Sequence, residues 1–153
     1  RSPDVTPVLY ETWARGPGHA FYTGTDPDYA SPSEMQAQVR AGYDQLKAAL
    51  DEANGGETAL IAPVGDAWEE ANYDRLHAND NWHAQNRGTL LAAMVIYGTV
   101  YGDDSIADIP LDGVLGSLNL AAADGIQLSS AAEAVLAPIP EPTAAALLLL
   151  SVA

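Results

Sequence analysis

The stretch "SPSEMQAQVRAGYDQLKAALDEANGGETALIAPVGDAW", residues 31–68, decides the fold class, because it places a helix directly before a strand. Ser31 is a typical N-cap, Pro32 suits the first helical position, and Glu34 completes a capping box. An apolar stripe follows at spacings of three and four, formed by Met35, Val39, Tyr43, Leu46 and Leu50. The Gly-Gly pair after it accepts positive φ, so the pattern predicts one helix that ends there.

The segment after the glycine pair predicts a strand of a parallel sheet. Residues 59–62 form a short, continuous apolar run that Pro63 stops. Directly after a helix, such a run is typical of a buried parallel strand. A second short strand is predicted at about residues 7–12, where "PVLYET" is rich in β-forming residues.

Two more helices are expected farther along the chain. A short one is predicted at about residues 66–73, with Asp66 as its cap. Residues 89–101 are apolar almost all round, which predicts a buried helix that Gly102 ends. The order strand, helix, strand, helix, loop, helix is typical of a layered α/β fold.

Composition limits the classes of function. The 153 residues are 48% hydrophobic and 18% charged, which is typical of a globular domain. Six basic residues stand against 21 acidic ones, for a net charge of -15. Such a surface repels nucleic-acid phosphates and anionic lipid head groups, so neither is an expected partner. The chain has no cysteine, which excludes disulfides, thiolate metal sites and a cysteine nucleophile.

The last 49 residues divide into two parts. Residues 105–137 begin with the loop-like "DIPLDGVLG" and end in "GIQLSSAAEAVLA", which predicts a terminal helix with a packing role. Residues 138–153 place a proline-rich hinge before an eleven-residue apolar run. Since a membrane span needs about 20 apolar residues, this run is expected to be a short apolar helix or a truncated span.

Polar residues that can carry chemistry gather in "LHANDNWHAQNRG", residues 76–88. Asp80 and His83 are three residues apart, so their side chains can meet in a tight turn. A carboxylate on one ring nitrogen of a histidine fixes its tautomer and stabilises the imidazolium formed during proton transfer. The pair is therefore a candidate catalytic base with its orienting acid. The alternative is a surface pair that contributes little.

Metal binding is a second alternative. His77, Asp80 and His83 follow at intervals of three, and both residue types ligate zinc. No further ligand stands out at a matching spacing, and Asn79 and Asn81 interrupt helical regularity, so we expect no metal and no cofactor. Asp103 and Asp104 are expected to form a helix-end turn, with a calcium site as the alternative.

Three further residues are candidates for the wall of a substrate pocket. Trp82 lies between Asp80 and His83 and can border an acyl group. Trp13 is expected in the core or in a pocket wall. His19 falls in a long Gly/Pro/Asp-rich loop, and such loops often carry function, so it can contact substrate.

The run "DNWHAQNRGTLLAAMVIYGTVYG", residues 80–102, resembles the last conserved block of the SGNH (GDSL-like) hydrolases. Asp80 and His83 match its Asp-x-x-His pair, and Gly88 matches the small residue before the final helix. The segments "LYETWAR" and "APVGDAW" are similar to the preceding strand regions of one bacterial branch. The three matches occur in the family's order.

The resemblance implies a partial α/β domain of the flavodoxin-like three-layer α/β/α type over residues 1–104. It also implies a serine esterase that acts on acyl groups of carbohydrates or lipids, with His83 as general base and Asp80 as its partner. The family's Gly-Asp-Ser nucleophile block and its oxyanion-hole Gly and Asn blocks do not occur in the sequence. The expectation is a C-terminal half that is inactive by itself.

The tail "IPEPTAAALLLLSVA" resembles a PEP-CTERM sorting signal, on the match of Pro140, Glu141 and Pro142. The basic end of such signals is missing, which suggests truncation. The resemblance implies export to the envelope or exterior of a Gram-negative bacterium, recognition by sorting machinery, and membrane contact through this tail alone. A plain proline hinge is the alternative. The rival to the esterase is a non-enzymatic exported envelope or matrix protein with a hydrolase-like scaffold.

Overall fold

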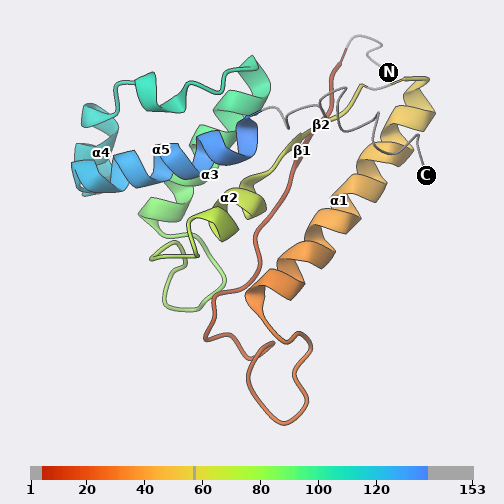
Figure 1. Ribbon diagram of the computed structural model, residues 1–153, viewed down its shortest axis with the longest axis horizontal. Coiled ribbons are helices and arrows are strands. Elements are labelled where there is room, and N and C mark those ends of the chain that lie inside the picture. Colours follow the sequence, from red (N-terminus) through yellow and green to blue (C-terminus); the bar gives the residue numbers. More distant parts are fainter. Residues whose placement is uncertain (1–4, 57, 138–153) are drawn as a thin grey trace, which may run out of the picture.

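The computed structural model describes residues 5–56 and 58–137, so the tail with its sorting-signal match lies outside the described residues. Within them the protein is a mixed α/β fold, mostly helical, with five α-helices and a two-stranded parallel sheet (Figure 1). The elements in chain order are β1 (Val8–Tyr10), α1 (Pro32–Asn54), β2 (Leu60–Ala62), α2 (Val64–Glu70), α3 (Asn86–Tyr101), a 3-10 turn (Ile106–Asp108), α4 (Asp112–Leu118) and α5 (Ala122–Leu136).

Helix α1 forms where its local signals predict it. The Ser31 hydroxyl accepts a hydrogen bond from the backbone N–H of Glu34 at 3.1 Å, and the Glu34 carboxylate accepts one from the N–H of Ala30 at 2.6 Å. The Glu34 side chain therefore bonds to the N–H of Ala30, which lies one residue before the N-cap Ser31. Gly55, with φ of 78°, ends the helix in the left-handed conformation that glycine favours.

The apolar stripe of α1 stays largely uncovered. In this helix, all of which is described, only Gln36 is buried, and that residue lies off the stripe. Leu46 is 47% exposed, and the remaining stripe residues are half-buried. Polar contacts rather than an apolar interface therefore attach α1 to the protein.

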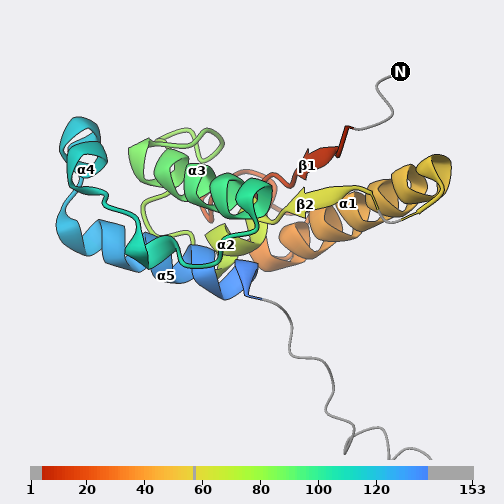
Figure 2. The same ribbon diagram turned by 90° about the horizontal axis from the view of Figure 1, so that it is seen from above.

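Both predicted strands form, and the second is parallel as expected; the two pair with each other, with Val8 opposite Leu60 and Tyr10 opposite Ala62. The sheet lies between α1 on one side and the group of α2, α3 and α5 on the other (Figure 2). Burial of the predicted run 59–62 is confirmed at its two ends, Ala59 and Ala62, whereas Leu60 is 40% exposed.

Helix α2 begins earlier than predicted. It starts at Val64 with Pro63 in the N-cap position, and it ends at Glu70 after about two turns. The predicted cap, Asp66, is wrong, because that carboxylate lies inside the helix and accepts hydrogen bonds from Arg40 instead. A β-carbon at Gly65 would collide with the carbonyl oxygen of Thr12, so only glycine allows α2 to lie this close to the chain that leaves β1.

The core is formed by the faces of α2, α3 and α5 that meet. Trp68, Leu91 and Leu128, one from each helix, are fully buried. Helix α3 ends at Gly102 as predicted, but its burial prediction holds for one face only, since Tyr101 is 71% exposed. The other face of α3 therefore remains exposed.

Residues 105–137 continue this core. The terminal helix is confirmed as α5, whereas the loop prediction for "DIPLDGVLG", residues 108–116, holds only for residues 109–111, because residues 112–116 form most of α4. The buried Arg87 of α3 pairs with Asp124 of α5, which joins the two helices by an ion pair. Among the described residues, no helix is long and apolar enough to cross a membrane.

Candidate functional site

Asp80 and His83 lie in the loop that joins α2 to α3, which folds back on itself as a narrow hairpin. His77 bridges to Ala84, and the N–H of Ala78 donates to the carbonyl of His83 at 2.7 Å. Asn81 adopts a positive φ of 56° and turns the tip. The hairpin lies beside the segment that leaves β1 (Figure 1), where the N–H of Gly16 donates to the carbonyl of Asn81 at 2.8 Å.

The contact expected between Asp80 and His83 is present. His83 Nδ1 lies 2.6 Å from Asp80 Oδ2, while Asp80 Oδ1 accepts the backbone N–H groups of Trp82 and His83, each at 2.9 Å. These donors, the His83 side chain first, hold the pKa of the Asp80 carboxyl well below its usual range. Because Nδ1 faces the carboxylate, Nε2 is the ring nitrogen left to exchange a proton.

Trp13 connects this loop to the core. Its indole N–H donates to the carbonyl of Trp82 at 3.0 Å, and its ring stacks on the buried Trp68 with centroids 4.0 Å apart and planes 7° apart. Trp82 in turn stacks on the His83 ring at 5.6 Å and 12°. The pair is therefore exposed to solvent but fixed in position by aromatic contacts that end in the core.

A hollow of about 290 Å³ opens beside the pair, between the hairpin and the first turns of α1. It is lined by Thr12, Trp13, Arg15, Met35, Val39, Trp82 and His83. The expectation that Trp13 and Trp82 border a pocket is met geometrically. Arg15, which sequence reasoning missed, places its guanidinium 3.9 Å from the centroid of the Trp82 ring.

His77 is a packing residue in this structure. Its Nε2 lies 2.9 Å from the carbonyl oxygen of Ala14, and its ring packs edge-on against Trp68 at 4.7 Å. Burial lowers its pKa, which favours the neutral imidazole. Among residues 5–56 and 58–137, no three His, Asp or Glu side chains converge to hold a metal, and His77 does not join Asp80 and His83 in one cluster.

His19 and the aspartates after α3 do not join the site. His19 Nδ1 accepts the backbone N–H of Phe21 at 3.2 Å, and the residue is not part of the hollow's lining. Asp103 forms the expected helix-end turn, since its Oδ1 accepts the N–H of Ser105 at 2.9 Å. The long loop after β1 therefore contributes its first residues to the site and not His19.

Close packing requires a glycine at position 88. It is buried at the start of α3, and a β-carbon there would meet both the carbonyl oxygen of Leu76 and the Trp68 ring at 2.5 Å. Glycine at this position therefore lets the base of the hairpin lie directly on the helix that follows it.

A buried polar cluster beneath the hollow positions α1. The carboxyl of Glu11, which is 1% exposed, accepts a hydrogen bond from Gln36 Nε2 at 2.6 Å, and Gln36 Oε1 accepts the N–H of Ala14 at 2.8 Å. Burial, reinforced by the neighbouring Asp66, raises the pKa of Glu11 to about 8. Folding therefore favours the protonated carboxyl at this position.

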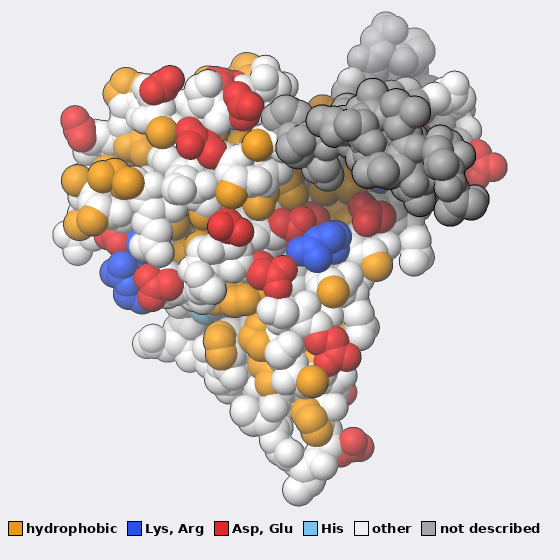
Figure 3. Space-filling view, in the orientation of Figure 1, with side chains coloured by type: hydrophobic (Ala, Val, Ile, Leu, Met, Phe, Trp, Pro, Cys, Tyr) orange, Lys and Arg blue, Asp and Glu red, His pale blue; other side chains and the backbone are white. Residues whose placement is uncertain are grey.

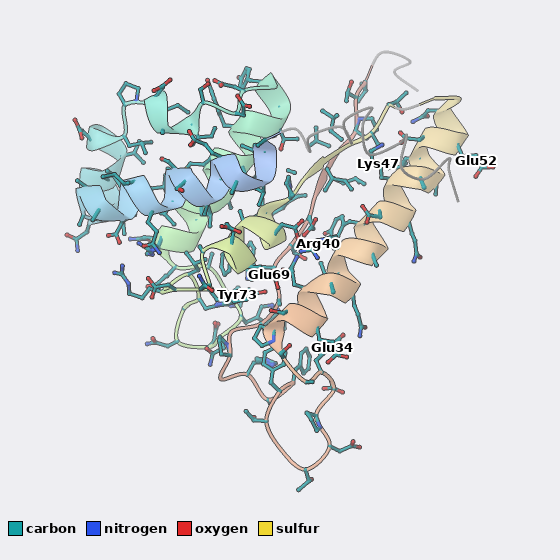
Figure 4. All side chains as sticks on the ribbon, in the orientation of Figure 1. Glu34, Arg40, Lys47, Glu52, Glu69 and Tyr73 are labelled. Atoms are coloured by element: carbon teal, nitrogen blue, oxygen red, sulfur yellow. The ribbon has the colours of Figure 1, made fainter. Side chains whose placement is uncertain are left out.

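Arg40 extends the same cluster toward α2. Its Nε donates to Asp66 Oδ1 at 2.7 Å, and a terminal nitrogen donates to Glu69 at 3.1 Å. Figure 4 shows Arg40 pointing from α1 toward Glu69. Met35 and Val39, which belong to α1, form one wall of the hollow. The polar contacts that attach α1 therefore also position this wall.

In comparisons with known proteins, no family model, curated protein or solved structure matched the chain. The chemistry of the site therefore rests on its geometry. No serine of the described part lines the hollow or hydrogen-bonds to His83. The arrangement holds His83 by Nδ1 and leaves Nε2 as the ring nitrogen that does not face Asp80.

Proposed function

We propose that this chain is the C-terminal part of an exported serine esterase in which His83 is the general base and Asp80 its orienting acid. The observation that carries the proposal is the 2.6 Å contact between His83 Nδ1 and Asp80 Oδ2 at the rim of a hollow. It fixes which ring nitrogen faces outward, as a catalytic base requires. The substrates are acyl esters of carbohydrates or lipids, and no cofactor takes part.

In this mechanism His83 Nε2 takes the proton of a serine hydroxyl while the serine oxygen attacks the acyl carbonyl. The imidazolium that forms is stabilised by the Asp80 carboxylate and returns the proton to the leaving alcohol. Water then releases the acyl group with His83 again as the base. The serine belongs to a Gly-Asp-Ser block that is not among these 153 residues.

The finer fold assignment is part of the same proposal. Among the described residues, β1 pairs with β2 alone, so its other edge is open. A flavodoxin-like three-layer α/β/α domain would continue the sheet at this edge with the strands of the remaining half. An open, partly apolar edge is otherwise an aggregation liability.

The test of the base is His83→Ala in the full-length parent, assayed with p-nitrophenyl acetate. Turnover should fall by about 10²–10⁴-fold, the usual contribution of a general base, while the circular dichroism spectrum is retained. His19→Ala is the matched control, because His19 lies outside the hollow. Unchanged turnover in the His83 variant removes the assignment.

A second test uses the 153-residue chain alone. It should hydrolyse p-nitrophenyl acetate no faster than buffer, since no described serine lies at His83. Robust turnover that depends on His83 would show that the chain carries its own nucleophile.

The alternative is a non-enzymatic exported protein with a hydrolase-like scaffold. It is favoured by the exposure of the pair, 72% for the His83 side chain and 50% for that of Asp80, which is typical of surface ion pairs. The gene upstream of this chain decides between the two. A Gly-Asp-Ser block there supports the esterase, and its absence supports the scaffold.

Export is proposed from the match of Pro140, Glu141 and Pro142 alone. Replacing all three by alanine in the parent should change its distribution among envelope and medium in a Gram-negative host. An unchanged distribution in cell fractionation contradicts the sorting role and leaves the esterase proposal intact.

A further inference from the structure

Arg15 differs from the other basic residues that the structure describes. Four of them form ion pairs with carboxylates, namely Arg40, Lys47, Arg75 and Arg87. Arg15 forms none, although acidic residues outnumber basic ones 21 to 6 in this chain. Figure 3 shows acidic side chains spread over one face of the molecule, with basic ones in few places.

The guanidinium of Arg15 is held in place by an aromatic ring, and one of its nitrogens, Nε, has no hydrogen-bond partner among the described residues. It lies 3.9 Å from the centroid of the Trp82 ring, a cation–π contact, and its Nε is buried with no hydrogen-bond partner among the described residues. A buried donor without a partner costs free energy and is rare in folded proteins. Such a group fits a place where a ligand atom supplies the missing acceptor.

The hollow that contains Arg15 has the make-up of a small-molecule site. Two indole rings and the side chains of Met35 and Val39 provide apolar walls, and polar atoms come from Thr12, Arg15 and His83. Apolar walls with a few placed polar groups are typical of ligand sites. Its volume of about 290 Å³ equals roughly ten water molecules, which is enough for one ring with a short substituent.

We propose that Arg15 is the anion-binding residue of this hollow, and that the ligand bound there carries a carboxylate on an apolar or ring-shaped body. The planar fork of a guanidinium matches a carboxylate through two parallel hydrogen bonds. Trp82 orients the fork, and the bond from Trp13 to the Trp82 carbonyl fixes Trp82. With a net charge of -15, most of the remaining surface repels such a ligand.

This role of Arg15 also defines the substrate class of the reaction, a step that rests on the proposed function. The esters turned over at His83 are acidic esters, with a free carboxylate in the acyl or alcohol part. Arg15 binds that carboxylate while the ester group lies near His83, since both residues line the same hollow.

The binding test uses the 153-residue chain and its own tryptophans, two of which line the hollow. Phenylacetate should change the fluorescence saturably at low salt, and phenylacetamide, its neutral counterpart, should bind at least ~10-fold more weakly, as expected for loss of a charge-assisted hydrogen bond. Equal binding of the two probes, or no binding of either, overturns the proposal.

Two variants assign the preference to Arg15. Arg15→Gln should abolish the preference for phenylacetate over phenylacetamide, and Arg15→Lys should keep part of it, because the charge remains but the fork is lost. Arg75→Gln is the control, since Arg75 lies outside the hollow and should leave the preference unchanged. If Arg15→Gln fails to fold, the Lys variant decides, and a full wild-type preference there shows that the fork plays no part and overturns the proposal.

A third measurement separates this inference from the esterase proposal. In the full-length parent, mono-p-nitrophenyl succinate should be preferred over p-nitrophenyl butyrate by about 10-fold in kcat/KM, a preference lost in Arg15→Gln. His83→Ala should lower turnover of both esters by about 10²–10⁴-fold and keep the preference for phenylacetate over phenylacetamide, because that preference depends on Arg15. Binding without turnover therefore contradicts the esterase alone, and turnover without acid preference contradicts the role of Arg15 alone.

Discussion

Helix α1 spans 23 residues and buries only Gln36, whereas α5 spans 15 residues and buries six. Both carry regular apolar positions, but α5 packs these against α3 and α2, and α1 leaves them half-exposed. One wall of the hollow comes from the hairpin, which is packed on the core, and the other comes from α1. Its hairpin wall is tied through Trp13 to the buried Trp68, and its α1 wall is held by Gln36 and Arg40. The two walls should therefore respond to different perturbations.

The largest effect on the free energy of unfolding is expected in the apolar core that holds the hairpin wall. Trp68→Ala removes a fully buried ring that packs on Trp13 and His77, and it should lower the free energy of unfolding by about 3–5 kcal/mol. Leu46→Ala, on the exposed stripe of α1, should change it by less than about 0.5 kcal/mol. Urea unfolding followed by far-ultraviolet circular dichroism measures both. Comparable losses would show that α1 is covered in solution.

A smaller and local effect is expected from Gln36→Leu. The substitution leaves the Glu11 carboxyl and the N–H of Ala14 without their partners, at a cost of about 1–3 kcal/mol. Because these contacts attach α1, hydrogen exchange should accelerate in α1 and not in α3. Gln38→Leu, on the exposed side of the same helix, is the control. Faster exchange spread evenly over both helices would argue against a separate attachment of α1.

A pH-dependent effect is expected from the charge state of Glu11. Its pKa is raised from 4.5 to about 8 in the folded protein, so between these values the folded state holds a proton that the unfolded state has released. Stability contributed by this group is complete below pH 4.5 and is lost as pH rises toward about 8. The groups that face it are Asp66, Arg40 and Gln36.

Glu11→Gln tests this dependence, because glutamine imitates the protonated acid. The variant should match the wild type at pH 5 and exceed its urea midpoint at pH 9. Glu52→Gln, at the exposed end of α1, should keep the wild-type dependence. A Glu11 variant that is less stable than the wild type at pH 9 would mean that the carboxyl is ionised in the folded protein.

Local signals in the sequence predicted the features that are themselves local. Ser31 and Glu34 cap α1 because the groups they satisfy lie within one turn. The contact of Asp80 with His83 is predictable for the same reason, since the hairpin tip brings residues three apart together. Parallel pairing followed from a helix between two apolar runs.

Features that depend on distant residues were missed. Arg15 contacts Trp82 across 67 positions of the sequence, and the residues next to either one give no signal that predicts the contact. Gln36 is not one of the apolar residues that define the stripe, so the periodicity gave no signal for its burial, although the buried Glu11 needs its amide. The stripe itself predicts burial only if a partner surface exists, and the described residues supply none for most of it.

The close approaches at Gly65 and Gly88 have a consequence for finding related proteins. At both positions a β-carbon would strike backbone atoms, which cannot move aside as a flexible side chain can. Residues of the hollow are free to change with the ligand, whereas these two glycines are required by the path of the chain. Sequences built on this scaffold should therefore keep the pair 23 residues apart, even where Asp80 and His83 have been replaced.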